Sequence, residues 1–294
     1  MGKRPSCLVQ PRGIPADSGT DVALPDSVEP AARLADFVRA RTASTLAICA
    51  LLATAGSAQA RNAGDPITLR FEEGDLVGLQ TVFAEGGDDA IGTIEFRQHR
   101  KGDELETLRI ARFSDGSSDE ELAIARVADG RLEALRGHQI MRDVSGQTTV
   151  QIDIDVVGDR VRASWGSSDD RKTMDEKVDL PPGTYWGPLV FIVLKNFAAN
   201  EENGRLVFHT VAPTPRPRMI DLELVRERGE KLERPGFTLA TERFHLRPTV
   251  HWTLDPILAV LLPDTSFWTV PGEPPGLALF EGPRNFGGQR IVLR

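Results

Sequence analysis

Apolar and polar residues alternate along most of the chain after residue 66, which is the pattern of β-strands that bury one face. The clearest alternating runs are 67–72, 91–97, 106–113, 150–156 and 219–225. The pair Gly158-Asp159 separates the fourth run from 160–165, which predicts a β-hairpin. The last two apolar runs, 277–280 and 290–293, are expected to pair. Short strands at this spacing favour a mainly β fold, a curved antiparallel sheet that forms a half-barrel or a barrel.

Two apolar segments break this alternation and predict two short apolar helices. The first, 187–198, has Pro188 near its start and is too apolar to bury only one face. The second, 255–263, has Asp255 as a candidate N-cap and a proline at each end. Strands and helices do not alternate regularly, so the pattern does not favour a doubly wound nucleotide-binding fold.

The first sixty residues have the composition of an export signal. The apolar stretch 45–53 follows two arginines, and the small-x-small sequence Ala58-Gln59-Ala60 comes after it. This stretch is far shorter than the roughly 20 residues of a membrane-spanning helix. We therefore expect residues 1–60 to be an N-terminal extension with a secretory signal peptide, and residues 61–294 to be a single β-rich domain without a transmembrane segment. Signal peptides usually have 15–30 residues, so the surplus favours a start codon further downstream.

Charge and cysteine content are compatible with an exported protein. After residue 60, 29 basic side chains face 38 acidic ones, a net charge of −9, and this acidity argues against binding to nucleic acid. Both cysteines, Cys7 and Cys49, lie before residue 61, so the expected mature chain has no thiol for a disulfide, a zinc ion or nucleophilic catalysis. We expect a bacterial protein with a periplasmic location, and secretion is the alternative.

Catalytic and metal-binding motifs do not stand out. His245, His251 and Asp255 lie within eleven residues of one another, but ordinary surface or packed histidines are the favoured interpretation. The stretch that begins at Asp153 resembles the start of a calcium loop, yet its later ligand positions lack oxygen donors. A Gly-x-Ser-x-Gly motif is missing as well. The sequence therefore indicates no metal and no cofactor, and an enzyme is the less favoured class.

Aromatic and large apolar residues gather in the C-terminal half of the expected mature chain, where three of the four tryptophans lie. Such residues fill a core, which is the simplest interpretation, or they line a pocket between a curved sheet and a helix. If a ligand pocket exists, its candidate lining residues are Val190, Phe191, Leu194, Trp252, Leu258, Leu261 and Trp268.

The sequence Leu180-Pro181-Pro182-Gly183-Thr184, followed by a short apolar helix and further strands, resembles a widespread group of exported bacterial proteins of unknown function. These proteins combine a signal peptide with a curved antiparallel sheet and are compared with lipoprotein-carrier half-barrels. The resemblance covers most of residues 66–294 and brings no catalytic residues. It implies a periplasmic location and an apolar ligand.

Two classes of function remain open after these observations. The first is a non-catalytic binding module for an apolar or lipid-like molecule. The second is an envelope scaffold or protein-interaction module, in which the proline-rich stretches 213–217 and 271–275 contact an envelope protein. The identity of a ligand, the protein partners and the oligomeric state do not follow from the sequence.

Overall fold

The computed structural model describes residues 61–212, 218–234, 236–249, 265–284 and 288–294. The chain divides into two units, Met1–Ala58 and Gln59–Arg294, and the description below concerns the second. Its strands are β1 (Ile67–Thr68), β2 (Leu76–Ala84), β3 (Ala90–Lys101), β4 (Glu104–Phe113), β5 (Ser118–Ala128), β6 (Arg131–Arg142), β7 (Thr148–Asp155), β8 (Arg160–Trp165), β9 (Lys172–Lys177), β10 (Arg205–Ala212), β11 (Arg218–Arg234), β12 (Phe237–Pro248), β13 (Thr265–Val270), β14 (Gly276–Pro283) and β15 (Arg290–Leu293). The helices are η1 (Ser168–Asp170), α2 (Leu189–Lys195) and η2 (Phe197–Ala199).

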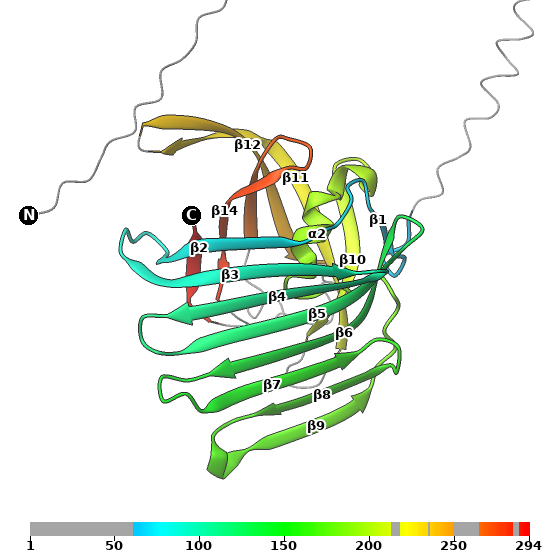
Figure 1. The fold of residues 1–294 in the computed structure, drawn as a ribbon, viewed down its shortest axis with the longest axis vertical. Coiled ribbons are helices and arrows are strands. Elements are labelled where there is room, and N and C mark those ends of the chain that lie inside the picture. The colour runs from blue at the N-terminus through cyan, green and yellow to red at the C-terminus, as the bar shows by residue number, and fades with distance from the viewer. Residues whose placement is uncertain (1–60, 213–217, 235, 250–264, 285–287) are drawn as a thin grey trace, which may run out of the picture. The chain divides into compact units, whose positions relative to one another are not determined.

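The strands form one antiparallel sheet with the order β10-β11-β12-β13-β14-β15-β2-β3-β4-β5-β6-β7-β8-β9, and β1 pairs with β6 beside this path. The sheet bends strongly, so that β10 to β15 turn back over the ends of β2 to β6 (Figure 1). The path ends at β10 and β9, which do not pair with each other. The prediction of a mainly β fold with a curved antiparallel sheet is therefore confirmed, whereas the alternative of a closed barrel is wrong.

Register shifts explain part of the curvature. The pairing slips by a residue at Val82/Phe83 in β2, at Ile124/Ala125 in β5, at Met141/Arg142 in β6 and at Trp268/Thr269 in β13. Each shift leaves an extra residue on one strand, which bends that strand and increases its twist. The hairpin predicted at Gly158-Asp159 and the pairing of the last two strands are both confirmed by the register of β7 with β8 and of β14 with β15.

The segment 67–72 differs from its prediction as a strand. Only Ile67 and Thr68 pair with β6. The Leu69 N–H still donates to the Gly130 carbonyl at 2.7 Å, but the N–H groups of Arg70 and Phe71 donate to Asn196 Oδ1 at 2.7 and 3.3 Å. Asn196 lies at the end of α2 and is fully buried. After Thr68 the segment therefore packs against the end of α2 instead of extending the sheet.

Helix α2 occupies the inside of the curved sheet. Its residues Leu189, Ile192, Val193 and Leu194 are buried and belong to the same core cluster as Phe208 of β10. The first predicted helix, 187–198, is thus confirmed as α2 followed by η2. The second, 255–263, lies outside the described residues.

The segment Leu180–Tyr185 connects the edge strand β10 with β6 and β1, which lie far from β10 along the path of the sheet. The Tyr185 N–H donates to the carbonyl of His209 in β10 at 2.7 Å, while its hydroxyl donates to the Leu132 carbonyl of β6 at 2.6 Å. The same hydroxyl accepts from the Ile67 N–H at 2.9 Å. Burial raises the pKa of Tyr185 to about 12, so the hydroxyl keeps its proton. A Cβ at Gly183 would collide with the backbone of Gly64, so this close contact requires glycine.

We expect Tyr185→Phe to lower the free energy of unfolding by roughly 2–4 kcal/mol, because the buried Ile67 N–H and Leu132 carbonyl lose their partner. Urea unfolding of both proteins measures the difference. The control is Thr241→Val in the β11–β12 hairpin, which removes one buried hydroxyl that donates to the Glu230 carbonyl. This control is expected to cost about 1 kcal/mol. A Tyr185→Phe loss no larger than that of the control would contradict the connecting role.

Candidate functional site

A groove of about 560 Å³ opens between α2, the first half of β2 and the β13–β14 turn. Its volume lies within the range of small-molecule sites. We call it the outer groove. Its lining residues include Leu76, Gly78 and Leu79 of β2, Phe96 of β3, Phe191, Leu194 and Lys195 of α2, and Pro274, Pro275 and Leu277 at the start of β14.

The mouth of the outer groove is unusually apolar. Two of its lining residues, Leu76 and Leu79, are 57% and 72% exposed. Together with Val77, which lies between them on β2 and does not line the groove, they make up half of the exposed large hydrophobic residues in the described part of the chain. On this side β2 pairs with β15 only through Val82–Ala84, so the described structure has no strand beside its first half. Leu76 and Leu79 therefore leave apolar surface exposed beside the groove.

A second cavity of about 210 Å³ lies further inside the curve of the sheet, and we call it the inner cavity. It shares Phe96 and Phe191 with the outer groove. These two rings meet edge to face at 4.9 Å between centroids, and Phe191 also contacts Phe267 at 5.9 Å. The Phe96–Phe191 pair therefore forms the boundary between the two spaces.

A network of charged side chains forms one end of the inner cavity. Arg109 of β4 donates through Nη2 to Asp119 at 2.8 Å and through Nε to Glu121 at 3.0 Å, both on β5. Gln139 of β6 donates to the same two carboxylates at 3.2 and 3.0 Å. Burial raises the pKa of Asp119 to about 6 against the opposing influence of Arg109. A buried, fully bonded cluster of this kind is positioned by the register of three neighbouring strands.

Arg284, which follows β14, completes the polar end of the inner cavity. Its guanidinium lies over the Phe113 ring at 3.4 Å and donates through Nη2 to Ser117 Oγ at 2.8 Å. Burial lowers the pKa of Arg284. The Nε atom is buried and has no hydrogen-bond partner. Arg109, Glu121, Gln139 and Arg284 thus line this end of the cavity. Asp119 does not line it and contacts Arg109 and Gln139.

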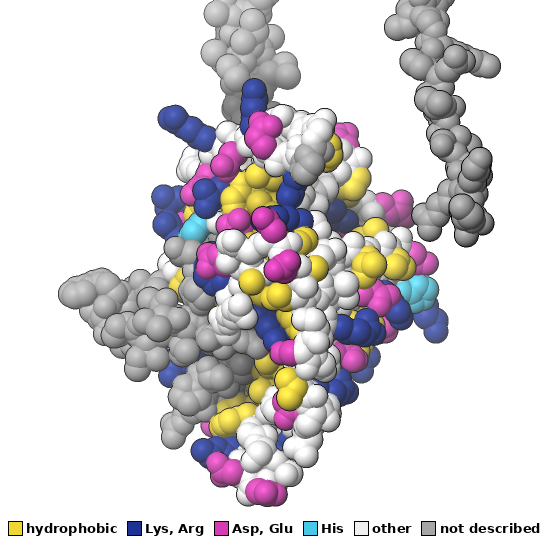
Figure 2. Space-filling model, turned by 90° about the vertical axis from the view of Figure 1, so that its left-hand side faces the viewer, with side chains coloured by type: hydrophobic (Ala, Val, Ile, Leu, Met, Phe, Trp, Pro, Cys, Tyr) yellow, Lys and Arg dark blue, Asp and Glu magenta, His cyan; other side chains and the backbone are white. Residues whose placement is uncertain are grey.

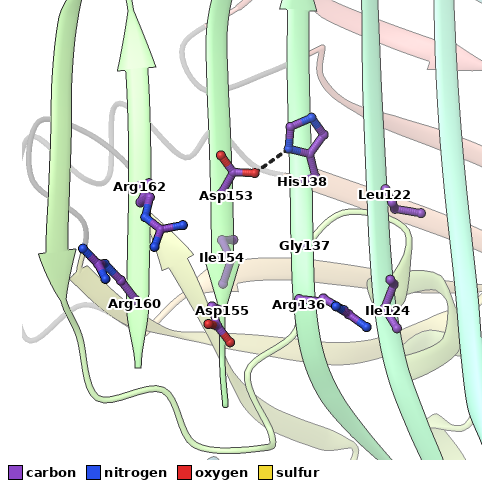
Figure 3. A pocket seen from close by; sticks show the side chains of 10 residues that line it. All are labelled: Leu122, Ile124, Arg136, Gly137, His138, Asp153, Ile154, Asp155, Arg160 and Arg162. Atoms are coloured by element: carbon purple, nitrogen blue, oxygen red, sulfur yellow. Dashed lines mark hydrogen bonds and ion pairs between the residues drawn. The ribbon is translucent and has the colours of Figure 1, made fainter. Parts of the chain in front are cut away.

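The outer face of the sheet carries a separate depression of about 310 Å³ over β5 to β8 (Figure 3). His138 Nδ1 and Asp153 Oδ1 lie 2.6 Å apart there, an arrangement in which a carboxylate orients an imidazole. Serine, threonine and cysteine are missing from the lining residues, so the pair faces no nucleophile. The nearby Arg160 is held by Asp175 at 2.6 Å through two bonds. This depression is therefore a solvated charge network rather than a site with exposed, unpaired charge.

Charges are mixed over the face drawn in Figure 2. Lysine and arginine side chains lie beside aspartate and glutamate side chains, and hydrophobic groups are exposed in small patches between them. A surface of this kind has no large region of one sign that would attract a polyanion or a polycation.

The structure brings together three of the seven residues predicted to line a pocket. Val190 lines the inner cavity, Leu194 lines the outer groove, and Phe191 lines both. Trp268 belongs to a different apolar cluster, where its indole donates to Glu230 at 2.8 Å and lies against Arg243. The remaining three, Trp252, Leu258 and Leu261, lie outside the described residues.

The predicted His/Asp group is described only through His245, whose Nδ1 lies 3.5 Å from Ser266 Oγ. His251 and Asp255 lie outside the described residues. Within the described ranges, no three His, Cys, Asp or Glu side chains are placed to hold a metal ion.

The sequence-based interpretation missed the polar end of the inner cavity. In the alternating run 106–113, the apolar residues Leu108, Ile110 and Phe113 predict the buried face. In the structure Thr107 and Ala111 are buried, so Arg109, which lies between them at the period of two, faces the inside. The sequence does contain an indication of this arrangement. The odd-numbered residues from Leu105 to Phe113 share one face of the strand, and Arg109 is the one charged residue among them.

Neither a family model nor a curated protein matches the chain. A solved structure that is similar is a β-barrel-like protein of a domain of unknown function, DUF1849, from Brucella abortus, with 8% identity and a TM-score of 0.41. The match covers 74% of this chain and 94% of that chain. Helices long and apolar enough to cross a membrane are absent from the described residues.

We expect Asp119 to make stability depend on pH. Its folded pKa of about 6 exceeds the ordinary value of 3.8, so the folded protein binds this proton more tightly than the unfolded chain does. The resulting stability is fully present below about pH 4 and is lost as the pH rises through about 6, a decrease on the order of 1–3 kcal/mol. Urea unfolding of the wild type and Asp119→Asn at several values between pH 4 and 7 measures it.

Asp119→Asn is expected to remove this decrease. The control Asp143→Asn alters an exposed turn carboxyl whose pKa is lowered, first by its hydrogen bond with Ser145, and it should leave the decrease in place. Identical pH dependence in the wild type and Asp119→Asn would show that Asp119 does not have a raised pKa.

Proposed function

We propose that this protein is a non-catalytic binding module for an apolar or lipid-like molecule, exported to the periplasm. The observation that carries the proposal is the outer groove, whose 560 Å³ are bounded by Phe96, Phe191 and Leu277. Burial of apolar surface from the ligand supplies the affinity, at about 25 cal/mol for each Å² removed from water. The exposed side chains of Leu76 and Leu79 at its mouth are then covered by the ligand.

A second observation supports a ligand over a packed core. Core side chains close the space around them, because protein interiors are packed to the density of organic crystals. Here Phe191 has space on two sides, since it borders both the outer groove and the inner cavity. The helix that presents Phe191 is itself firmly held, because Lys195 and Asn196 bind the buried carboxylate of Glu73.

The location rests on the first sixty residues. The arginines at 39 and 41, the apolar stretch 45–53 and Ala58-Gln59-Ala60 support export to the periplasm, and secretion is the alternative. Expression of the full chain in a Gram-negative host, followed by osmotic release and N-terminal sequencing, is expected to yield a protein that starts at Arg61. The double variant Leu51→Arg/Leu52→Arg interrupts the apolar stretch and should keep the chain in the cytoplasm. Recovery of the uncleaved chain from the cytoplasm in both cases would contradict export.

The second candidate is an envelope scaffold that binds an extended peptide. The first half of β2 favours it, because a strand edge without a neighbour offers backbone donors and acceptors beside apolar side chains. The stretch 271–275 belongs to this region as well, since Pro274 and Pro275 line the outer groove.

Native mass spectrometry of the protein released from a bacterial envelope is expected to show a reproducible added mass that organic solvent extracts. Phe191→Ala should reduce the bound fraction about tenfold, since an aromatic anchor at the centre of the site is lost. The matched control is Val193→Ala, because Val193 is fully buried on the same helix but lines neither space. An added mass that is a peptide would favour the scaffold. A mass equal to that of the chain alone, with folding intact, would contradict both candidates.

A further inference from the structure

Only the end of β2 has a strand on both sides. There it pairs with β15 through Val82–Ala84, and Thr81 exchanges backbone hydrogen bonds with Arg294 at 3.4 and 3.2 Å. Before Thr81, β2 still pairs with β3 as far back as Leu76, but its other edge has no strand beside it in the described ranges. The outer groove opens along this free edge, and the start of β14 lies on its far side.

The backbone groups of Val77 and Leu79 point to this free edge. In an antiparallel sheet, successive residues direct their N–H and C=O groups alternately to one neighbouring strand and to the other. Thr81 directs its groups toward Arg294, so Leu79 and Val77 direct theirs to the same side, because the pairing of β2 with β3 is regular from Leu76 to Thr81. Both residues are exposed. The edge therefore offers two N–H donors and two carbonyl acceptors at the spacing of an extended chain.

The two faces of the sheet offer apolar contacts beside this edge. Gly78 pairs with Phe96, which lines the outer groove and the inner cavity, so Gly78 belongs to the inner face. A Cβ at Gly78 would meet one atom within 4 Å, the Cβ of Phe96 at 4.0 Å, so the space over this glycine is open. Val77 and Leu79 belong to the outer face by alternation. A strand beside β2 would cover Val77 and Leu79 outside and reach Phe96 and Phe191 inside.

The shape of the outer groove favours a single extended segment over a second copy of this chain. Pro274, Pro275 and Leu277 line the groove together with residues of α2, so a strand that pairs with β2 enters a space that has walls on more than one side. Strand β2 of a second copy carries β3 directly behind it. A single peptide segment has no strand behind it and needs only the width of one strand, about 4.8 Å.

We propose that the free edge of β2 and the outer groove bind one extended peptide of a partner protein, antiparallel to β2, with an aromatic residue opposite Gly78. The residues on both sides of the aromatic one exchange backbone hydrogen bonds with Leu79 and Val77, and their side chains cover these two on the outer face. The aromatic side chain lies over Gly78 against Phe96 and Phe191, as aromatic residues cover a glycine across a strand pair. The inference rests on the second candidate function, because it names the peptide that the same groove recognises.

A labelled peptide tests the proposal on the wild-type protein. The probe is acetyl-Thr-Val-Phe-Val-Thr-Lys-amide with fluorescein on its lysine, and fluorescence anisotropy measures its dissociation constant. N-methylation of both valines removes the two N–H groups that face β2, whereas N-methylation of the phenylalanine removes one that faces away from it. We expect the first change to weaken binding about tenfold or more and the second less than about threefold. Alanine in place of the phenylalanine should also weaken binding about tenfold, because the side chain in the groove is lost.

Three variants place the probe on β2. Leu79→Pro removes an N–H that faces the probe and leaves the bonds to β3 in place, so it should weaken binding about tenfold. The matched control Leu79→Ala keeps this N–H and should weaken binding less than about threefold. Gly78→Val fills the space over the glycine and should reduce the preference for phenylalanine over alanine to less than about threefold. Circular dichroism checks folding, and if Leu79→Pro fails to fold, the N-methylated probes decide alone.

The outcomes separate this inference from the proposed function. Binding that both N-methylations weaken equally would overturn the strand pairing and leave peptide binding in the groove standing. Failure of the probe to bind at its highest soluble concentration would overturn the inference together with the second candidate function, and the candidate of an apolar ligand would remain for its own test. A wild-type dimer that binds no probe and that Leu79→Pro converts to a monomer would assign the free edge to a second copy instead.

Discussion

The buried hydroxyl of Tyr185 holds the curved sheet around its interior. It links the Ile67 N–H to the Leu132 carbonyl, while the backbone of the same residue donates to His209 on the edge strand β10. Because the sheet does not close into a barrel, strand pairing does not hold β10 against the strands β6 to β9 at the other end of the path. The segment Leu180–Tyr185 supplies the missing connection through backbone bonds that tolerate no side chain at Gly183. With β10 fixed in this way, α2 is enclosed by β10 to β13 on one side and by β2 to β6 on the other.

The enclosed helix determines which parts of the interior stay unfilled. Phe191 contacts Phe96 of β3 and Phe267 of β13, two strands that the curvature brings to opposite sides of α2. The outer groove and the inner cavity exist because this ring packs at the boundary instead of filling either space. The polar end is equally dependent on the fold, since Arg109, Asp119 and Gln139 come from three strands whose register places them together.

Local features of the fold followed from the sequence, and long-range ones did not. Alternation of apolar and polar residues predicted the strands and the β7–β8 hairpin, because both depend on neighbouring residues. The segment 67–72 alternates equally well, yet the N–H of Arg70 donates to the side chain of Asn196, which lies more than a hundred residues away in the sequence. Of the predicted lining residues, Phe191 and its neighbours on α2 were accessible to sequence reasoning because apolar helices are recognisable. Arg109 was not, because a charged residue on the buried face is recognised only when the partners that neutralise it are known.

The most direct test of this account is a crystal structure of the protein with an alkyl ester that carries bromine at the end of its chain. The account places the anomalous bromine peak inside the curve of the sheet beside Phe191, in the outer groove or the inner cavity. A peak confined to the outer face of the sheet, or none at a saturating concentration of the ester, would contradict the claim that the interior is a binding site.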